Sequence, residues 1–156
     1  MKSVDFHYNL ADAGWADATI SEGSDSETMT VSYLRDSLSE LTDAINLLLK
    51  GGKESRAIFM SEPGEHLMSL NNPKDDELEI EVRWFKDWAS WNMNSEKDYD
   101  VVFKRTTSLF EFANKVCDNL DQIYIKEGIE GYKEKWVEHD FPMNSYLKLK
   151  KLLGRK

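Results

Sequence analysis

Residues 78–85 read Leu-Glu-Ile-Glu-Val-Arg-Trp-Phe, the most regular alternation of apolar and charged side chains in the chain. Successive side chains of a strand point to opposite faces, so this pattern predicts a β-strand with one apolar and one charged face. Antiparallel sheets commonly bury one face and leave the other in water. The segment therefore predicts an antiparallel sheet that packs on one side only.

Shorter alternations lie on both sides of this segment. Residues 6–10, 16–20 and 29–33 predict a first group of three strands, and residues 58–60, 67–70 and 99–104 predict three more around residues 78–85. The sequence Glu62-Pro63-Gly64-Glu65 predicts a type II turn, because proline presets the first central position and glycine accepts positive φ at the second.

A helix is predicted between the two groups of strands. Its apolar residues recur at spacings of four and three, which places them on one helix face: Leu34, Leu38, Leu41, Ile45 and Leu48. Ser32 is the expected N-cap, and Gly51-Gly52 supply the left-handed backbone that often ends a helix. This apolar face is expected to cover a sheet.

The C-terminal third is predicted to be helical. Ser108 and Glu111 have the spacing of a capping box, Gly128 is expected to break the helix that follows, and Pro142 is expected to start a last one. The order of elements predicts a single α+β domain, residues 1–156, with a mainly antiparallel sheet of about seven strands (three, helix, four), a long covering helix and C-terminal helices. Eight residues are predicted to form its core: Leu38, Leu41, Ile45, Ile80, Val82, Phe112, Val116 and Leu120.

Composition limits the classes of partner and compartment. The chain carries 29 acidic and 20 basic residues, a net charge of −9, which repels nucleic-acid phosphates and favours a basic protein partner. The longest apolar run, Leu47 to Leu49, is far shorter than the ~20 residues of a membrane helix. With one cysteine, Cys117, no intramolecular disulfide can form, and a cytoplasmic protein is expected.

No residue pattern predicts catalysis, a metal or a cofactor. His7, His66 and His139 are far apart in sequence and are interpreted as surface or boundary residues, and no zinc-ligand spacing occurs. Cys117 lies on the apolar side of its predicted helix, where a cysteine behaves as a small hydrophobe. No Gly-x-Ser-x-Gly nucleophile turn is present.

An acidic group stands out at the start of the alternating strand: Asp75, Asp76, Glu77, Glu79 and Glu81. Three interpretations remain open: a solvated sheet face, charges that protect a sheet edge from mispairing, or a docking patch for a basic protein. In the third, reversing Asp75, Asp76, Glu79 and Glu81 to lysine is expected to weaken binding and leave the fold intact, because these positions should face water.

Two tryptophans follow the same strand. Trp88 and Trp91 are three residues apart, as one helical turn would place them. They are interpreted either as a cap on one end of the core or as an exposed anchor, since tryptophan is enriched at binding hot spots.

Several turns, caps and core positions together resemble a family of uncharacterised bacterial single-domain proteins of about this length: Gly14-Trp15-Ala16, Ser32-Tyr33-Leu34-Arg35-Asp36, Glu62-Pro63-Gly64-Glu65, Gly131-Tyr132, Trp136 and Phe141-Pro142. These motifs specify a fold and carry no chemistry. By analogy of type, small acidic proteins of this kind are often immunity proteins paired with secreted toxins.

The sequence leaves two hypotheses about function, which belong to different classes of protein. The first is an immunity protein that blocks a basic toxin such as a nuclease, with the acidic group standing in for phosphates and the tryptophans anchoring the interface. The second is a small-molecule-binding domain or enzyme with a pocket between the sheet and the long helix. A filled core with an exposed acidic face favours the first, and a deep polar pocket favours the second.

Overall fold

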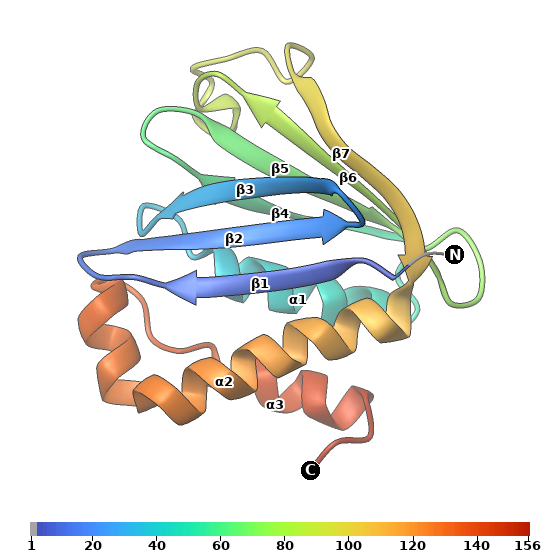
Figure 1. Cartoon of the computed structure of the whole chain (residues 1–156), viewed down its shortest axis with the longest axis vertical. Coiled ribbons are helices and arrows are strands. Elements are labelled where there is room, and N and C mark those ends of the chain that lie inside the picture. The colour runs from blue at the N-terminus through green and yellow to red at the C-terminus, as the bar shows by residue number, and fades with distance from the viewer. Residues whose placement is uncertain (1–2) are drawn as a thin grey trace.

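A computed structural model describes residues 3–156, which form seven strands, three α-helices and one short 3-10 helix (Figure 1). In chain order the elements are β1 (Asp5–Leu10), β2 (Trp15–Glu22), β3 (Asp25–Ser32), α1 (Ser37–Leu49), β4 (Glu54–Met60), β5 (Glu65–Asn71), β6 (Glu77–Phe85), η1 (Ala89–Trp91), β7 (Asp100–Ser108), α2 (Leu109–Trp136) and α3 (Met143–Leu152). The predicted α+β class, with three strands, a helix, four strands and C-terminal helices, is confirmed.

The strands form two antiparallel sheets, β1-β2-β3 and β4-β5-β6-β7. Each hydrogen-bonded pair is also consecutive in the chain, as expected for strands joined by short turns. The alternating segment lies in β6, where Val82 faces Met68 of β5 on one side and Phe103 of β7 on the other. The single sheet expected from the sequence is thus divided into two.

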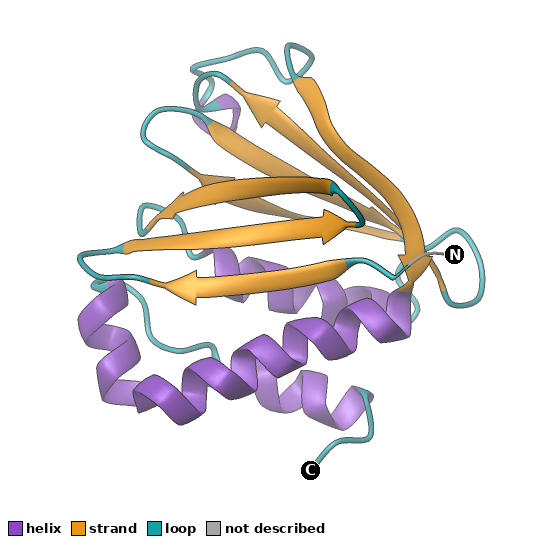
Figure 2. Cartoon of the chain, in the orientation of Figure 1, coloured by secondary structure: helices purple, strands orange, loops and turns teal. Residues whose placement is uncertain are grey.

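The three α-helices gather on one side of the strands (Figure 2). The main core lies between them and the apolar strand faces, and α2 and β1 meet there through Phe112 and Phe6, whose ring centroids are 6.0 Å apart. The eight predicted core residues are all fully buried, at 0% exposure, which confirms the predicted core. Side chains therefore fill most of the interior between strands and helices, and a cavity of about 170 Å³ remains between β1 and α2.

The predicted start of the first helix is wrong. Ser32 is the last residue of β3, paired with Trp15, and its hydroxyl donates to the Glu62 carboxylate at 2.5 Å. A residue held in a strand ladder cannot also cap a helix, and α1 begins at Ser37, so Leu34 lies outside it. The predicted end is correct, because Gly51 follows the helix with φ +105°.

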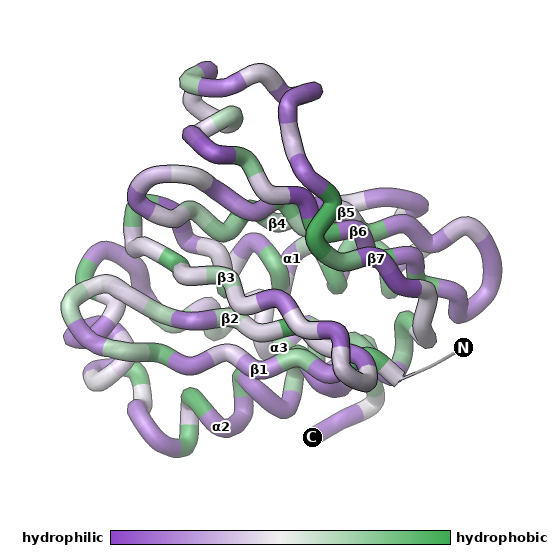
Figure 3. The backbone as a smooth tube through the Cα atoms, turned by 45° about the horizontal axis from the view of Figure 1, so that its top comes forward, coloured by the Kyte–Doolittle hydropathy of each residue, from purple (hydrophilic) through white to green (hydrophobic). Residues whose placement is uncertain are grey.

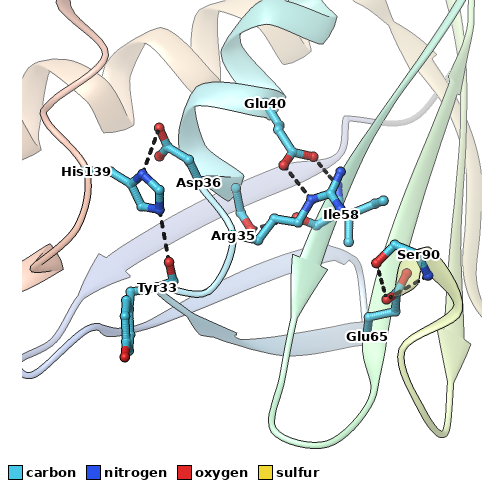
Figure 4. A network of polar contacts seen from close by, with 9 residues as sticks. Tyr33, Arg35, Asp36, Glu40, Ile58, Glu65, Ser90 and His139 are labelled. Atoms are coloured by element: carbon cyan, nitrogen blue, oxygen red, sulfur yellow. Dashed lines mark hydrogen bonds and ion pairs between the residues drawn. The ribbon is translucent and has the colours of Figure 1, made fainter. Parts of the chain in front are cut away.

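The N-terminal half of α1 covers the free edge of β4. Ser37 Oγ donates to the carbonyl of Ile58 at 2.6 Å, and the Ile58 N–H donates to Glu40 Oε1 at 3.1 Å. Arg35 donates to the other oxygen of Glu40 at 2.7 Å (Figure 4). An exposed strand edge can pair with another chain, so these bonds protect β4 against mispairing.

The turn between β4 and β5 differs from the predicted type II turn. Ser61 and Gly64 face each other across it, with the Ser61 N–H donating to the Gly64 carbonyl at 2.8 Å. The two central residues are therefore Glu62 and Pro63, joined by a cis peptide bond. Gly64 does adopt the expected positive φ, at +93°, and a Cβ there would lie 2.3 Å from the Trp84 ring.

α2 begins and bends as predicted. Ser108 Oγ accepts from the Glu111 N–H at 3.1 Å, which is half of a capping box, and Gly128 interrupts the helix with φ +68°. Within residues 3–156, none of the helices combines the length and the apolar character needed to cross a bilayer.

Candidate functional site

The candidate site lies on the outer face, the face of β4–β7 that is turned away from the main core. Its side chains form cross-strand rows that change from polar to apolar along the sheet. The rows are Glu54-Asn71-Glu79-Thr106, Arg56-Ser69-Glu81-Lys104, Ile58-Leu67-Arg83-Val101 and Met60-Glu65-Phe85. In Figure 3, the residues of β7, counted over both faces, change along the strand from hydrophobic to hydrophilic.

A depression of about 550 Å³, the outer groove, crosses this face. Its lining residues are Glu54, Ser55, Arg56, Leu67, Ser69, Asn71 and Arg83. The groove is shallow and mostly polar, and it is open to solvent, as expected for the wet side of an antiparallel sheet.

At the apolar end of the groove lies a smaller cavity of about 120 Å³, the Glu65 pocket, whose lining residues are Arg56, Ile58, Glu65, Leu67, Arg83, Phe85, Ala89, Ser90 and Glu96. The segment between β6 and β7, residues 86–99, closes one side of it and is called the tryptophan loop below. Ile58, Leu67, Phe85 and Ala89 form a second small core under this loop, separate from the main one.

Glu65 is the least expected residue of the pocket, because a carboxylate is rarely buried without a charged partner. Its side chain is 1% exposed. Oε1 accepts from the Ser90 N–H at 3.3 Å and from Ser90 Oγ at 2.8 Å, as Figure 4 shows. Oε2 is buried and has no hydrogen-bond partner among the described residues. Glu65 thus anchors η1 with one oxygen and keeps the other free.

The charges of the outer face are partly neutralised within the chain. Arg83 Nε donates to Glu81 Oε2 at 2.5 Å, and Lys104 Nζ lies 3.6 Å from Glu81 Oε1. The bond from Arg83, together with the charge of Lys104, lowers the pKa of Glu81. Arg83 also lies over the Tyr99 ring, 4.7 Å from its centroid. In residues 3–156, Arg56 takes part in no ion pair.

The acidic group predicted from the sequence is spread over different roles. Asp76 caps α2, because its carboxylate accepts from the Phe110 N–H at 2.8 Å and from the Ser108 hydroxyl. Glu81 is engaged by Arg83 and Lys104, Glu77 is half buried at the start of β6, and Asp75 and Glu79 are exposed. Of the four positions expected to face water, Asp75, Asp76 and Glu79 are exposed, and the expectation is wrong for Glu81, which is half buried. Asp76 also supplies an acceptor at the N-terminus of α2, so its reversal would act on the fold as well.

The two tryptophans also have different environments. They lie on and beside η1 with their rings 5.1 Å apart, edge to face. Trp88 is half buried and its Nε1–H donates to the Ser61 carbonyl at 2.7 Å, whereas Trp91 is 47% exposed. Trp88 therefore fastens the tryptophan loop to the β4–β5 turn, and Trp91 is free for contact.

The structure does not bring the acidic loop and the tryptophans together. The nine residues of β6 lie between Asp76 and Trp88. At the rise of a strand, β6 alone is about 27 Å long. They flank opposite ends of the outer face, so one partner could contact both only by covering most of it.

The histidines are not brought together either. His7 is exposed, while His66 is 5% exposed, so the interpretation of His66 as a surface or boundary residue is wrong. His66 Nε2 lies 2.8 Å from Glu27 Oε2, and burial lowers the pKa of His66 more than Glu27 raises it. His139 donates to the Tyr33 carbonyl at 2.9 Å, and its Nδ1 is 3.9 Å from Asp36 (Figure 4).

Burial also shifts the pKa values of Asp36 and Cys117. Burial raises the pKa of Asp36, and the nearby His139 opposes this effect. Burial likewise raises the pKa of the Cys117 thiol to about 11, so the thiolate needed of a nucleophile is not formed near neutral pH. In the described part of the chain, no three histidine, cysteine or acidic side chains are grouped to hold a metal ion.

Sequence reasoning missed the Glu65 pocket. A signal was present: residues 57–60 and 67–68 are apolar on both faces of their strands, which indicates a second buried layer at that end of the sheet. Glu65 itself lies in a turn motif that gives no hint of burial. Comparison with protein-family models, curated proteins and solved structures found no match. The resemblance drawn from turns and caps stays a prediction.

Proposed function

We propose that the chain is an immunity protein, which binds a basic bacterial toxin through the outer face and the tryptophan loop and neutralises it in the cytoplasm. The observation that supports this most is that the tryptophan loop and the start of β7, which follows it, expose apolar residues. Trp91, Met93 and Val101 are 47%, 58% and 50% exposed. Apolar side chains clustered within a polar rim are typical of protein-interaction sites.

The composition of this surface fits a protein partner. Tryptophan, tyrosine, methionine and arginine are enriched at interface centres, and the loop and adjoining rows supply Trp91, Met93, Tyr99 and Arg83. Trp91 packs against Trp88, whose own hydrogen bond holds it in place. A preorganised aromatic anchor loses little side-chain entropy on binding, so Trp91 is the expected hot spot.

Charge supports a basic partner. With a net charge of −9, the chain attracts a basic protein from a distance and speeds the encounter. Asp75 and Glu79 are the members of the acidic group that are exposed and whose carboxylates have neither an ion pair nor a hydrogen bond in the described residues. A small-molecule role would need a deep pocket between sheet and long helix, and it is less favoured because the cavity between β1 and α2, which Tyr8, Gln122 and Glu127 help to line, holds only about 170 Å³.

The test is a protection assay in a bacterial host. Each open reading frame next to the gene is expressed alone and then together with this chain, and growth is followed. We expect one neighbour to arrest growth and the wild-type chain to restore it. Trp91→Ala should weaken protection, whereas the control Ile125→Ala, a change on exposed α2 surface, should not. Protection that depends on Ile125 and not on Trp91 would contradict the proposed surface.

A further inference from the structure

We propose that the Glu65 pocket is the specificity site of this interface and receives one basic side chain, arginine or lysine, from the partner. The cationic group would bond to the free Oε2 of Glu65, and the methylene stem would lie along the apolar wall. This inference rests on the proposed function and names the chemistry of the partner at one position.

The first observation is the unpartnered oxygen. Glu65 is 1% exposed and lines the pocket, and its Oε2 has no partner among the described residues. A buried carboxylate oxygen without a donor destabilises the protein, so such groups are expected where a ligand supplies the donor. Ser90 holds the carboxylate through Oε1, so Oε2 is the oxygen that still lacks an N–H donor.

The second observation is the wall of the pocket. Ile58, Leu67 and Phe85 line it, and all three are buried. Long basic side chains bury their methylene groups on apolar surface and place the charge at the tip. The cavity volume of about 120 Å³ is that of one side chain and leaves no room for a folded segment.

The charges around the pocket favour a cation at its base. Arg83 is held by Glu81 and lies over Tyr99, so its charge is already compensated. Arg56 is exposed at the mouth, where a long side chain can turn into solvent, and Glu96 offsets it on the rim. The charge that cannot move away is the carboxylate of Glu65.

The experiment uses the full ¹⁵N-labelled chain and small probes, so it needs no partner protein. N-acetyl-arginine N-methylamide and N-acetyl-lysine N-methylamide are titrated against the neutral isostere N-acetyl-citrulline N-methylamide. The readout is the Ser90 amide, which bonds directly to Glu65. We expect the cationic probes to shift this resonance and to bind about tenfold more tightly than the citrulline probe, as for a hydrogen bond to a charged group.

Two variants sharpen the result. Glu65→Gln should lower the affinity of the cationic probes to that of citrulline, while the control Glu130→Gln, on the exposed surface of α2, should change nothing. Arg56→Ala should raise their affinity, because it removes a competing positive charge. If Glu65→Gln fails to fold, two measurements still test the inference: the affinities of the cationic and citrulline probes for the wild-type chain, and the affinity of the cationic probes for Arg56→Ala.

Three outcomes would overturn the inference. Equal binding of the citrulline probe would show that charge is not recognised. Binding of N-acetylglycine that Arg56→Ala abolishes would make the pocket an anion site. Absence of any shift at Ser90 would leave Glu65 as a structural anchor of η1. None of these outcomes requires the chain to lose its protective effect on growth. The protection assay therefore distinguishes a wrong assignment of the Glu65 pocket from a wrong proposed function.

Discussion

Replacing Asp76 with alanine should destabilise the protein through α2, although the side chain is exposed. The carboxylate accepts from the Phe110 N–H at 2.8 Å and from the Ser108 hydroxyl, and both donors lie at the start of α2. Loss of an N-terminal cap costs about 0.5–2 kcal/mol, and loss of a negative charge near a helix N-terminus adds about 0.3–1 kcal/mol. For an exposed site we expect a total of about 1–2 kcal/mol.

The assay is urea unfolding followed by circular dichroism. With a slope of about 2 kcal/mol per molar urea, the midpoint should fall by about 0.5–1 M. The matched control is Asp75→Asn, which also removes one charge. Asparagine is chosen because Asp75 has φ +46°, a conformation that asparagine tolerates and alanine does not. Equal midpoints for the two variants would refute the capping role and return Asp76 to the solvated acidic group.

Three further predictions concern close packing at a glycine, a buried histidine and a buried cysteine. Gly64→Ala should lower the free energy of unfolding by at least about 2 kcal/mol, since its Cβ would meet Trp84 at 2.3 Å. Gly23→Ala, with open space around it, should lower it by about 1 kcal/mol. Urea midpoints of the two variants measure the difference. Burial lowers the pKa of His66, so as pH falls the unfolded chain binds a proton there before the folded chain does. The free energy of unfolding should therefore fall as pH drops below about 6.5. Urea midpoints measured from pH 7.5 to 5 should show this fall, and His66→Gln should make it smaller. Cys117, buried with a pKa of about 11, should react with a thiol reagent at pH 8 only after unfolding, and fast labelling of the native protein would contradict its place in the core.

The order of elements was predictable because it depends on local patterns. The alternation in residues 78–85 and the helical spacing of Leu38, Leu41 and Ile45 each report which face of an element is buried. Boundaries set by long-range contacts were not predictable. Ser32 could not be assigned to β3 rather than to a helix cap without knowing that it pairs with Trp15.

The candidate site was less predictable for the same reason. The acidic residues were visible, but their partners lie far along the chain: Asp76 contacts the start of α2, and Glu81 contacts Lys104. Burial of Glu65 depends on Ser90, twenty-five residues later, folding back over the sheet. Sequence spacing does not reveal such a contact, since nothing local distinguishes Glu65 from a solvated turn residue.

The central claim is that a partner covers the outer face and the tryptophan loop, and hydrogen–deuterium exchange of the chain with its purified partner tests this most directly. We expect the partner to slow exchange in residues 86–99 and at Ser90 in particular, with no change in α2 beyond Gly128. The protection should weaken with Trp91→Ala. Protection confined to α2 and α3, with residues 86–99 exchanging as in the free chain, would contradict the account.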